Sequence, residues 1–221
     1  MALQESMRED STIIVMGEDV GLYGGAYGVT KGMIEEFGEK RILDTPISEE
    51  GIVGCAVGSA MTGLRPVVEL MYVDFVMLAM DQLANQAAKI RYMFGGQISV
   101  PMVMRAQGGT GRSGAAQHSQ SLEAWMMHTP GLNLAMPATV NDAYLLLKHA
   151  LKLSDPVVFI EHKMLYTLKG DLNKSESISW GQAAILRSGS DFTLVTYSRM
   201  VHRALEAAER LAELGIQAEV I

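Results

Sequence analysis

The sequence has little of several features that define other classes of protein. A single cysteine, Cys55, stands among 221 residues, so no internal disulfide can form, and a lone thiol is typical of a reducing compartment. Positive charge is also scarce, with 18 Lys and Arg against 25 Asp and Glu and a formal net charge of −7. Nucleic acids and anionic membranes attract lysine and arginine, so neither is an expected partner.

Long apolar runs and targeting segments are missing as well. No uncharged run approaches the ~20 residues of a membrane-spanning helix, and no basic segment with an apolar core opens the chain. We therefore expect a soluble, cytoplasmic protein. What the chain does have is 48% hydrophobic residues against 19% charged ones, with 16 methionines and 22 glycines. This balance favours a sizeable core and a surface that another chain covers.

Segments typical of strands alternate with segments of helical periodicity. Strands are expected around residues 11–20, 40–46, 65–72, 100–106, 132–138 and 156–162. Helices are expected over about Glu49–Thr62, Asp74–Gly96, Ser119–His128 and Thr139–Leu153, the last with a capping box of Thr139 and Asp142. Strands that alternate with helices form a parallel sheet covered on both faces. The sequence therefore predicts an α/β fold, a three-layer doubly wound parallel sheet.

The composition changes after residue 167. Residues 168–190 are polar and typical of a linker, and residues 191–221 have the strand–helix–strand pattern of another α/β unit. One such unit cannot bury both of its faces alone. We expect a complete domain over 1–167 and the beginning of a truncated second domain over 191–221, whose remainder is cut off or supplied by a partner.

The segment DTPISEEGIVG, residues 44–54, places two glutamates at the start of a glycine-rich helix. Ser48 occupies the expected N-cap position, and acids in the first turn complement the helix dipole, so Glu49 and Glu50 could both be ordinary helix-start residues. One face of the helix is bare at three positions, Gly51, Gly54 and Gly58. The pattern leaves open whether a second helix or a flat ligand covers that face.

Four longer segments carry a resemblance to a known family. They are GEDVGLYGGAYGVTKG, RILDTPISEEGIVGCAVGSAMTGLRPVVE, DFVMLAMDQLANQAAKIRYMFGG and GAAQHSQSLEAWMMHTPGL. In this order they closely resemble the β subunit of the thiamine-diphosphate-dependent decarboxylating component of 2-oxoacid dehydrogenase complexes, of pyruvate, acetoin or branched-chain type. The resemblance covers essentially the whole chain. It implies a transketolase-like pyrimidine-binding domain followed by the start of the family's C-terminal domain.

The resemblance assigns roles to residues at the predicted strand ends, where doubly wound sheets bind ligands. Glu49, in the motif ISE, would hydrogen-bond to the pyrimidine nitrogen of thiamine diphosphate and so help to activate the cofactor. Phe75 would stack on the pyrimidine, and Met71 and Leu70 would line the same pocket. Glu18 resembles an acid in a chain of carboxylates that links paired active sites, although a strand-end acid facing water is an equal alternative.

His118 is the second expected catalytic residue. It follows the small-residue loop GGTGRSGAAQ, which is the kind of segment that closes over an active site. An imidazole there can exchange a proton with the substrate carbonyl or assist the passage of the acyl group to a lipoyl arm.

The resemblance alone implies a potassium site. Its ligands would be mostly backbone oxygens, which suit a hard cation but leave almost no signature in a sequence. The residues are Met102, Ala150, Leu151, Leu153 and Asp155.

A missing motif indicates a partner. The diphosphate-binding half of such enzymes has a G-D-G motif and a later asparagine for magnesium, and KGDLN, residues 169–173, does not match it. The resemblance therefore implies that an α subunit holds the diphosphate and magnesium, and that this chain alone is inactive. It also implies an α2β2 heterotetramer docked on a lipoyl-bearing acyltransferase core.

The expected function is oxidative decarboxylation of pyruvate, or cleavage of acetoin, with acyl transfer to a lipoyl group. Three alternatives remain: a branched-chain 2-oxoacid dehydrogenase β subunit, a transketolase or deoxyxylulose phosphate synthase fragment, and a non-catalytic assembly subunit. The transketolase-type motif usually has arginine just before the glutamate, where Ser48 stands here. Retention of Glu49, Phe75 and His118 argues against a purely structural role.

Overall fold

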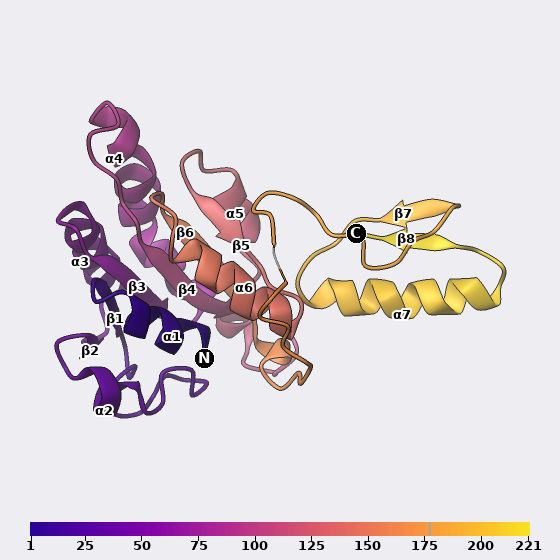
Figure 1. The fold of residues 1–221 in the computed structure, drawn as a ribbon, viewed down its shortest axis with the longest axis horizontal. Helices are drawn as coiled ribbons and strands as arrows, with labels where there is room; N and C mark the ends of the chain where they lie inside the picture. The colour runs from indigo at the N-terminus through magenta and orange to yellow at the C-terminus, as the bar shows by residue number, and fades with distance from the viewer. Residues whose placement is uncertain (177) are drawn as a thin grey trace.

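The structure, a computed structural model, describes residues 1–176 and 178–221. A six-stranded sheet forms its centre (Figure 1). In spatial order the strands are β2 (Ile42–Asp44), β1 (Ile13–Gly17), β3 (Arg65–Leu70), β4 (Val103–Gly108), β6 (Val157–His162) and β5 (Asn133–Ala135). Every neighbouring pair is parallel. The chain goes from β1 to one side and then crosses back to the other, which confirms the predicted doubly wound α/β fold.

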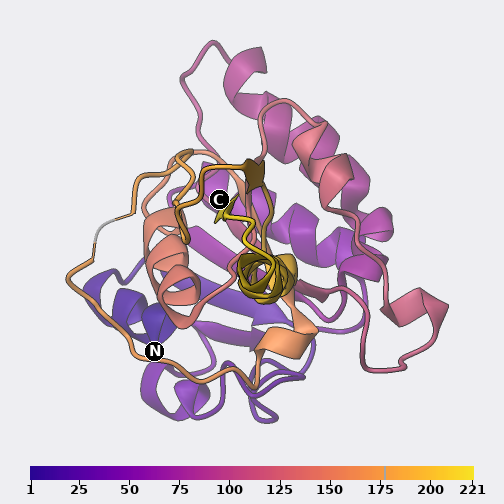
Figure 2. The same cartoon turned by 90° about the vertical axis from the view of Figure 1, so that its right-hand side faces the viewer.

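Alternate residues of each strand enter different cores, because successive strand side chains point to opposite faces. In β1, Ile14 and Met16 lie in one core and Ile13 and Val15 in the other. The first core is covered by α3 (Glu49–Met61), the three helical segments between β3 and β4, and α5 (Glu123–Met127). The second is covered by α1 (Ala2–Glu9), α2 (Met33–Phe37) and α6 (Val140–Ala150). Figure 2 shows helices on both sides of the sheet, which makes the three predicted layers.

The single helix predicted over 74–96 is wrong in detail. The segment consists of a 3₁₀ helix η1 (Val73–Ala79), a π-helix η2 (Asp81–Ala87) and α4 (Ala88–Met93). Its buried positions explain the change. Val73, Val76 and Ala79 are three residues apart, as the 3₁₀ repeat requires, whereas Leu83 and Ala87 follow at steps of four.

Helix α3 begins at Glu49 as predicted, but Ser48 does not cap it with its side chain. The Ser48 carbonyl accepts from the Ile52 amide at 2.8 Å, while a Cβ added at Gly51 would lie 2.8 Å from the Ser48 hydroxyl oxygen. The hydroxyl therefore rests against Gly51. Farther along, a Cβ added at Gly54 would meet the side chain of Gln82, whereas one added at Gly58 would meet no atom outside its own helix within 4 Å in the described part of the chain.

The capping box of α6 is confirmed. The Asp142 amide donates to Thr139 Oγ1 at 3.0 Å, and the Thr139 amide donates to the Asp142 carboxylate at 3.0 Å. Helix α6 ends at Ala150, three residues before the predicted end at Leu153.

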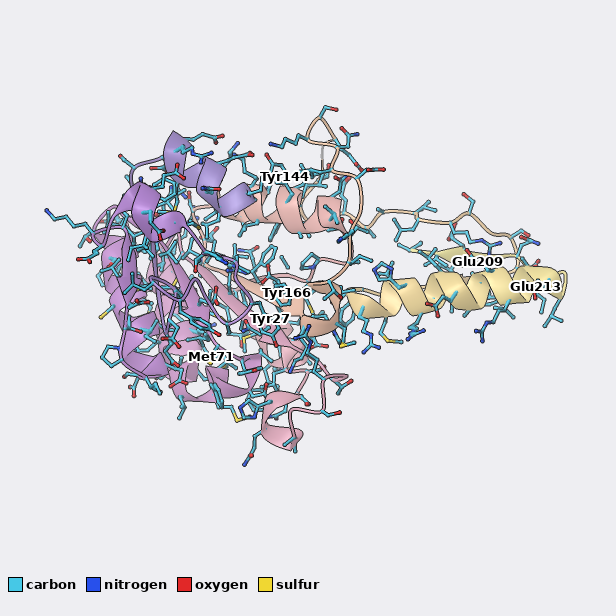
Figure 3. All side chains as sticks on the ribbon, turned by 90° about the horizontal axis from the view of Figure 1, so that it is seen from below. Tyr27, Met71, Tyr144, Tyr166, Glu209 and Glu213 are labelled. Atoms are coloured by element: carbon cyan, nitrogen blue, oxygen red, sulfur yellow. The ribbon has the colours of Figure 1, made fainter. Side chains whose placement is uncertain are left out.

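Helix α1 has no counterpart among the predicted elements. It packs on α6, where Tyr144 donates to the Glu5 carboxylate at 2.6 Å and Lys148 pairs with Glu9 at 2.8 Å. Figure 3 shows Tyr144 on this side of the molecule.

Residues after 191 form the predicted strand–helix–strand unit. It consists of β7 (Phe192–Leu194), α7 (Arg199–Glu213) and β8 (Ala218–Val220), with the two strands parallel. Its own small core contains Ala208, Ala218 and Val220. Figure 1 shows this unit projecting from one side of the sheet domain. The domain boundaries at residues 167 and 190 stay predictions. Within the described residues, every helix is too short or too polar to cross a membrane.

Candidate active site at the carboxyl edge of the sheet

The parallel strands direct their carboxyl ends to one edge, where the predicted site residues follow them. Glu18 comes after β1, Met71 and Phe75 after β3, and the loop 109–120 after β4. In Figure 3, the labelled Met71, Tyr27 and Tyr166 mark this edge. Doubly wound sheets bind ligands at this edge.

Glu49 is buried at this edge, with 5% of its surface exposed. The strand β2 ends at Asp44 and a short turn leads into α3, so Glu49 occupies the first helical position and its carboxylate lies near the positive end of the helix dipole. Among the described residues, no donor forms a hydrogen bond to this carboxylate, in contrast to the buried Glu69, which accepts from Arg105. The Glu49 oxygens are not among the fully enclosed polar atoms that lack a partner, so the carboxylate still reaches the edge, where a ligand can bind it.

Glu18 lies in the electrostatic field of Glu49. Burial raises the pKa of the Glu18 carboxyl, and the negative charges of Glu49 and Asp19 raise it further. Both effects favour the protonated form of Glu18 over its charged form. The arrangement agrees with the predicted carboxylate chain, although the role of Glu18 stays a prediction.

Phe75 and His118 lie together in an aromatic group with Tyr72. The His118 ring meets Tyr72 edge to face at 4.7 Å and 80°, and Phe75 at 5.5 Å and 86°. The Tyr72 and Phe75 rings are themselves 5.9 Å apart at 87°. His118 Nδ1 is buried and has no hydrogen-bond partner in the described part of the chain.

The loop 109–120 carries His118 and is closed at its base. The Gly109 amide donates to the Gln120 carbonyl at 2.9 Å. A Cβ at Gly109, where φ is +82°, would lie 2.3 Å from His162 Nε2, so only glycine fits there. At the tip, Ser113 and Ala115 take φ values of +55° and +66°, a strained region for residues with a Cβ. Such strain persists where the surroundings fix the chain, as at binding sites.

Beneath the edge lies a buried ion triad that the sequence reasoning missed. Arg105 in β4 pairs with Glu69 of β3 at 2.8 Å and with Glu161 of β6 at 2.5 Å. Burial alone would lower the pKa of Arg105, but the attraction of Glu161 and Glu69 outweighs it and raises that pKa above its usual value. The signal in the sequence is a charge inside each of three apolar strands, VVEL, VMRA and VFIEH.

Two tyrosines extend the triad toward the edge. Tyr166 donates to Glu161 at 2.6 Å, and burial raises the pKa of its phenol well above the ordinary value. Tyr27 stacks on Tyr166 with ring centres 4.5 Å apart and planes at 15°, and the Arg112 guanidinium lies 5.4 Å from the centre of the Tyr27 ring. Figure 3 labels the two tyrosines side by side. The charges of the triad are thereby covered by aromatic surface.

The other predicted pocket residues divide into two kinds. Met71 is half-buried at the edge. Leu70 is fully buried in the first core, among apolar side chains of the sheet and helices. Leu70 therefore supports the edge from below, and its contact with a ligand stays a prediction.

The oxygens predicted to bind potassium already have partners. Arg65 Nη1 donates to the carbonyls of Leu151 and Leu153 at 3.1 and 2.9 Å, and Arg91 pairs with Asp155 at 2.7 Å. The remaining two oxygens belong to Met102 and Ala150, which accept from backbone amides. A carbonyl has two lone pairs, so a hard cation could still share these oxygens, but in competition with the Arg65 charge.

Comparison with known proteins gives two family matches. The family described as "Transketolase, pyrimidine binding domain" matches residues 1–169, and "Transketolase, C-terminal domain" matches residues 181–221.

Individual relatives match the chain from end to end. It is 46% identical to the acetoin:2,6-dichlorophenolindophenol oxidoreductase subunit beta of Cupriavidus necator and 46% to the 2-oxoisovalerate dehydrogenase subunit beta of Bacillus subtilis. Both alignments cover 100% of this chain and 68% of the relative. It is 48% identical to the mitochondrial pyruvate dehydrogenase E1 component subunit beta-1 of Arabidopsis thaliana, over 100% of this chain and 62% of that protein.

Solved structures agree on the fold. A split-gene transketolase described as an inactive beta4 tetramer gives a TM-score of 0.80 at 22% identity, covering 99% of this chain and 67% of that one. The transketolase of Campylobacter jejuni gives 0.76 at 18% identity, covering 99% and 33%. At these identities the likeness concerns the fold alone.

Proposed function

Because this chain belongs to the transketolase pyrimidine-binding family and, within it, to the E1 β subunits of 2-oxoacid and acetoin dehydrogenases, we propose that it supplies the pyrimidine half of a thiamine diphosphate site. The observation that carries the proposal is the buried Glu49 without a hydrogen-bond partner among the described residues, at the edge where such folds bind ligands.

The residues at the edge suit the cofactor of this family. Thiamine diphosphate, when bound, supplies the carbon nucleophile that attacks a carbonyl group. Glu49 would form a hydrogen bond with the pyrimidine ring nitrogen and hold a proton there. The ring nitrogen would thus be the hydrogen-bond partner that Glu49 lacks in the described part of the chain. Phe75 would orient the ring by aromatic contact, with Met71 beside it. Glu18, whose pKa is raised by burial and by the charge of Glu49, would belong to the carboxylate chain that the resemblance implies.

His118 would handle the substrate proton. Its Nδ1 is enclosed, so Nε2 is the nitrogen that can exchange a proton with a substrate oxygen. The aromatic edges of Tyr72 and Phe75 keep the imidazole in one orientation. A proton donor fixed in this way contributes by general acid–base catalysis.

An α subunit would complete the site. The proposal assigns the diphosphate and its magnesium to that subunit, since the G-D-G motif is absent here. Exposed apolar side chains on η1 and at the end of α4 support a partner. They are Met77, Leu78, Tyr92, Met93 and the C-cap residue Phe94, of which Tyr92 is 90% exposed. We propose an α2β2 heterotetramer docked on a lipoyl-bearing acyltransferase core.

Potassium belongs to the proposal only as a structural ion. The Arg65 contacts to Leu151 and Leu153 make its binding dependent on shared carbonyls. The test is the thermal midpoint in potassium chloride against tetramethylammonium chloride at equal ionic strength. An equal midpoint in both salts removes potassium from the proposal.

The proposed substrate is pyruvate or acetoin. Relatives named for pyruvate, acetoin and 2-oxoisovalerate are about equally similar, at 46–48% identity, so similarity does not choose among them. A small acyl unit suits a methionine-rich pocket, since each extra methylene needs apolar space worth about 0.8 kcal/mol. The cytoplasmic location also stays a prediction, because the Arabidopsis relative is named mitochondrial.

The experiment is co-expression with an α-type subunit, followed by assays of pyruvate, acetoin and 3-methyl-2-oxobutanoate side by side. Turnover of either of the first two supports the proposal, and preference for the branched substrate overturns the choice of substrate only. No turnover of any of the three by an assembled, cofactor-loaded complex would favour the assembly role.

A further inference from the structure

Lys163 is a buried cation without a part in the proposed chemistry. It follows β6, is 2% exposed, and its ammonium lies 4.9 Å from the centre of the Tyr72 ring. Burial lowers the pKa of Lys163, while the negative charge of Asp74 works against that change. Because a buried charge is costly unless it is hydrogen-bonded, the contacts of this ammonium indicate what it stabilises.

Lys163 and Asp74 hold the same peptide unit from its two ends. Lys163 Nζ donates to the carbonyl oxygen of His118. The buried Asp74 accepts, through Oδ1, from the amides of Ser119 and Gln120 at 3.1 and 3.0 Å. The His118 carbonyl and the Ser119 amide belong to one planar peptide group. One cation and one anion therefore fix both of its polar atoms.

This grip, by which we mean the hydrogen bonds of Lys163 and Asp74 to residues 118–120, fixes the backbone that carries the imidazole. The plane of a peptide group follows the ψ angle of the residue before it, which here is His118. On the other side, the His118 amide donates to the Ala115 carbonyl at 3.3 Å. With both sides held, the ring stays edge to face against Tyr72 and Phe75.

The contacts are of the strong kind. Hydrogen bonds with one ionised partner are about twice as strong as neutral ones, and the three bonds that Lys163 and Asp74 make to this turn are of that type. The ammonium also lies over Tyr72, the ring that His118 contacts at 4.7 Å. One cation thus orients both the His118 backbone and the ring beside it.

We propose that Lys163, acting with Asp74, is a positioning residue that holds the imidazole of His118 in the orientation needed for proton transfer. The catalytic part of this proposal rests on the proposed function of His118, whereas the structural part concerns this chain alone. The two parts are tested separately.

The structural test uses the isolated chain and the variant Lys163→Met, with Lys169→Met as the control at an exposed lysine nearby. Ring carbon–proton spectra identify the His118 signal by its loss in His118→Gln. We expect the His118 signal to shift in Lys163→Met and the Ser119 amide to exchange at least tenfold faster, with β4 amides unchanged. An unchanged signal and unchanged exchange in the folded variant would overturn the proposal.

A second variant covers failure of Lys163→Met to fold. Asp74→Asn keeps the shape of the side chain and one acceptor but removes the charge at the other end of the grip. We expect faster exchange of the Ser119 and Gln120 amides in this variant. Exchange at the wild-type rate would overturn the grip.

The catalytic test uses the complex with the α subunit. Lys163→Met should lower kcat at least tenfold with KM within twofold, and Lys163→Arg should restore most of it because a donor returns. A shifted His118 spectrum with unchanged kcat would refute the positioning role. A wild-type complex without turnover would refute the proposed function instead. The His118 spectra and the amide exchange would still show whether Lys163 and Asp74 fix the backbone at His118.

Discussion

At the scale of single residues, Glu49 and Glu18 show how a site can cost stability. Both carboxylates occupy a partly dry region, and the pKa of Glu18 is raised by burial and by the charge of Glu49. A carboxyl whose pKa is raised on folding destabilises the protein once it ionises. The penalty is absent below the unfolded pKa and complete above the folded pKa.

We predict that Glu49→Gln removes nearly all turnover of the assembled enzyme and raises the thermal midpoint of the isolated chain at pH 7. The rise should be about 2 °C, kept small by solvent screening at Glu18, and should vanish at pH 3, where the Glu18 carboxyl with its raised pKa is protonated and carries no penalty. Scanning calorimetry at the two pH values checks it. A gain of equal size at pH 3 would mean that packing, not charge, is responsible.

Arg105 gives a second prediction at this scale. Arg105→Met should lower the free energy of unfolding by about 3–5 kcal/mol, because Glu69 would remain buried without its counter-charge. The matched control is Arg203→Met, which removes the exposed pair with Glu206 and should cost less than about 1 kcal/mol. Urea unfolding of both variants measures the two changes in the free energy of unfolding. Changes of similar size would contradict the larger contribution that we assign to the buried triad.

At the scale of elements, Gly131 joins α5 to β5 at a close approach to α4. Its φ is +100°, and an added Cβ would lie 2.0 Å from the Ala88 carbonyl oxygen. Gly63, after α3, has φ +101°, but a Cβ added there would meet nothing within 4 Å among the described residues. The two glycines share the backbone conformation and differ in the space around them.

We predict that Gly63→Ala costs about 1–2 kcal/mol, the price of the left-handed conformation, and that Gly131→Ala costs clearly more. Denaturant unfolding of both variants measures the difference. Equal losses would show that the chain between α5 and β5 relaxes away from Ala88 without cost.

The elements also show what the sequence could predict. Strands of β-branched residues and the Thr139–Asp142 capping box are local signals, and the sheet and α6 follow from them. The η1–η2 segment could not be predicted, because its geometry follows from which residues the core buries. Glu49, Phe75 and His118 were named from motifs, but Lys163 gives no motif, since its partner is a backbone carbonyl 45 residues away in sequence.

At the scale of the whole molecule, the proposed cofactor site is divided between two chains. In this proposal the edge of the sheet would hold the pyrimidine, and the anchor for the diphosphate would lie on another subunit. We predict that the isolated chain binds thiamine diphosphate with magnesium weakly or not at all. Titration calorimetry checks this, with the α-containing complex as the positive control. Tight, magnesium-dependent binding by the isolated chain would contradict the division of the site.

The β7–β8 ribbon has a consequence for colloidal behaviour. β8 bonds to β7 on one side and to Arg187 on the other, which leaves β7 as an outer strand with Val195 79% exposed just beyond it. An outer strand with apolar side chains is a template for strand addition between molecules. The light scattered per unit of protein concentration should therefore rise with concentration, and Val195→Lys should reduce that rise because a charged side chain beside an outer strand opposes pairing with another copy. If Val195→Lys leaves the scattering unchanged, the surface through which the molecules associate lies elsewhere on the chain.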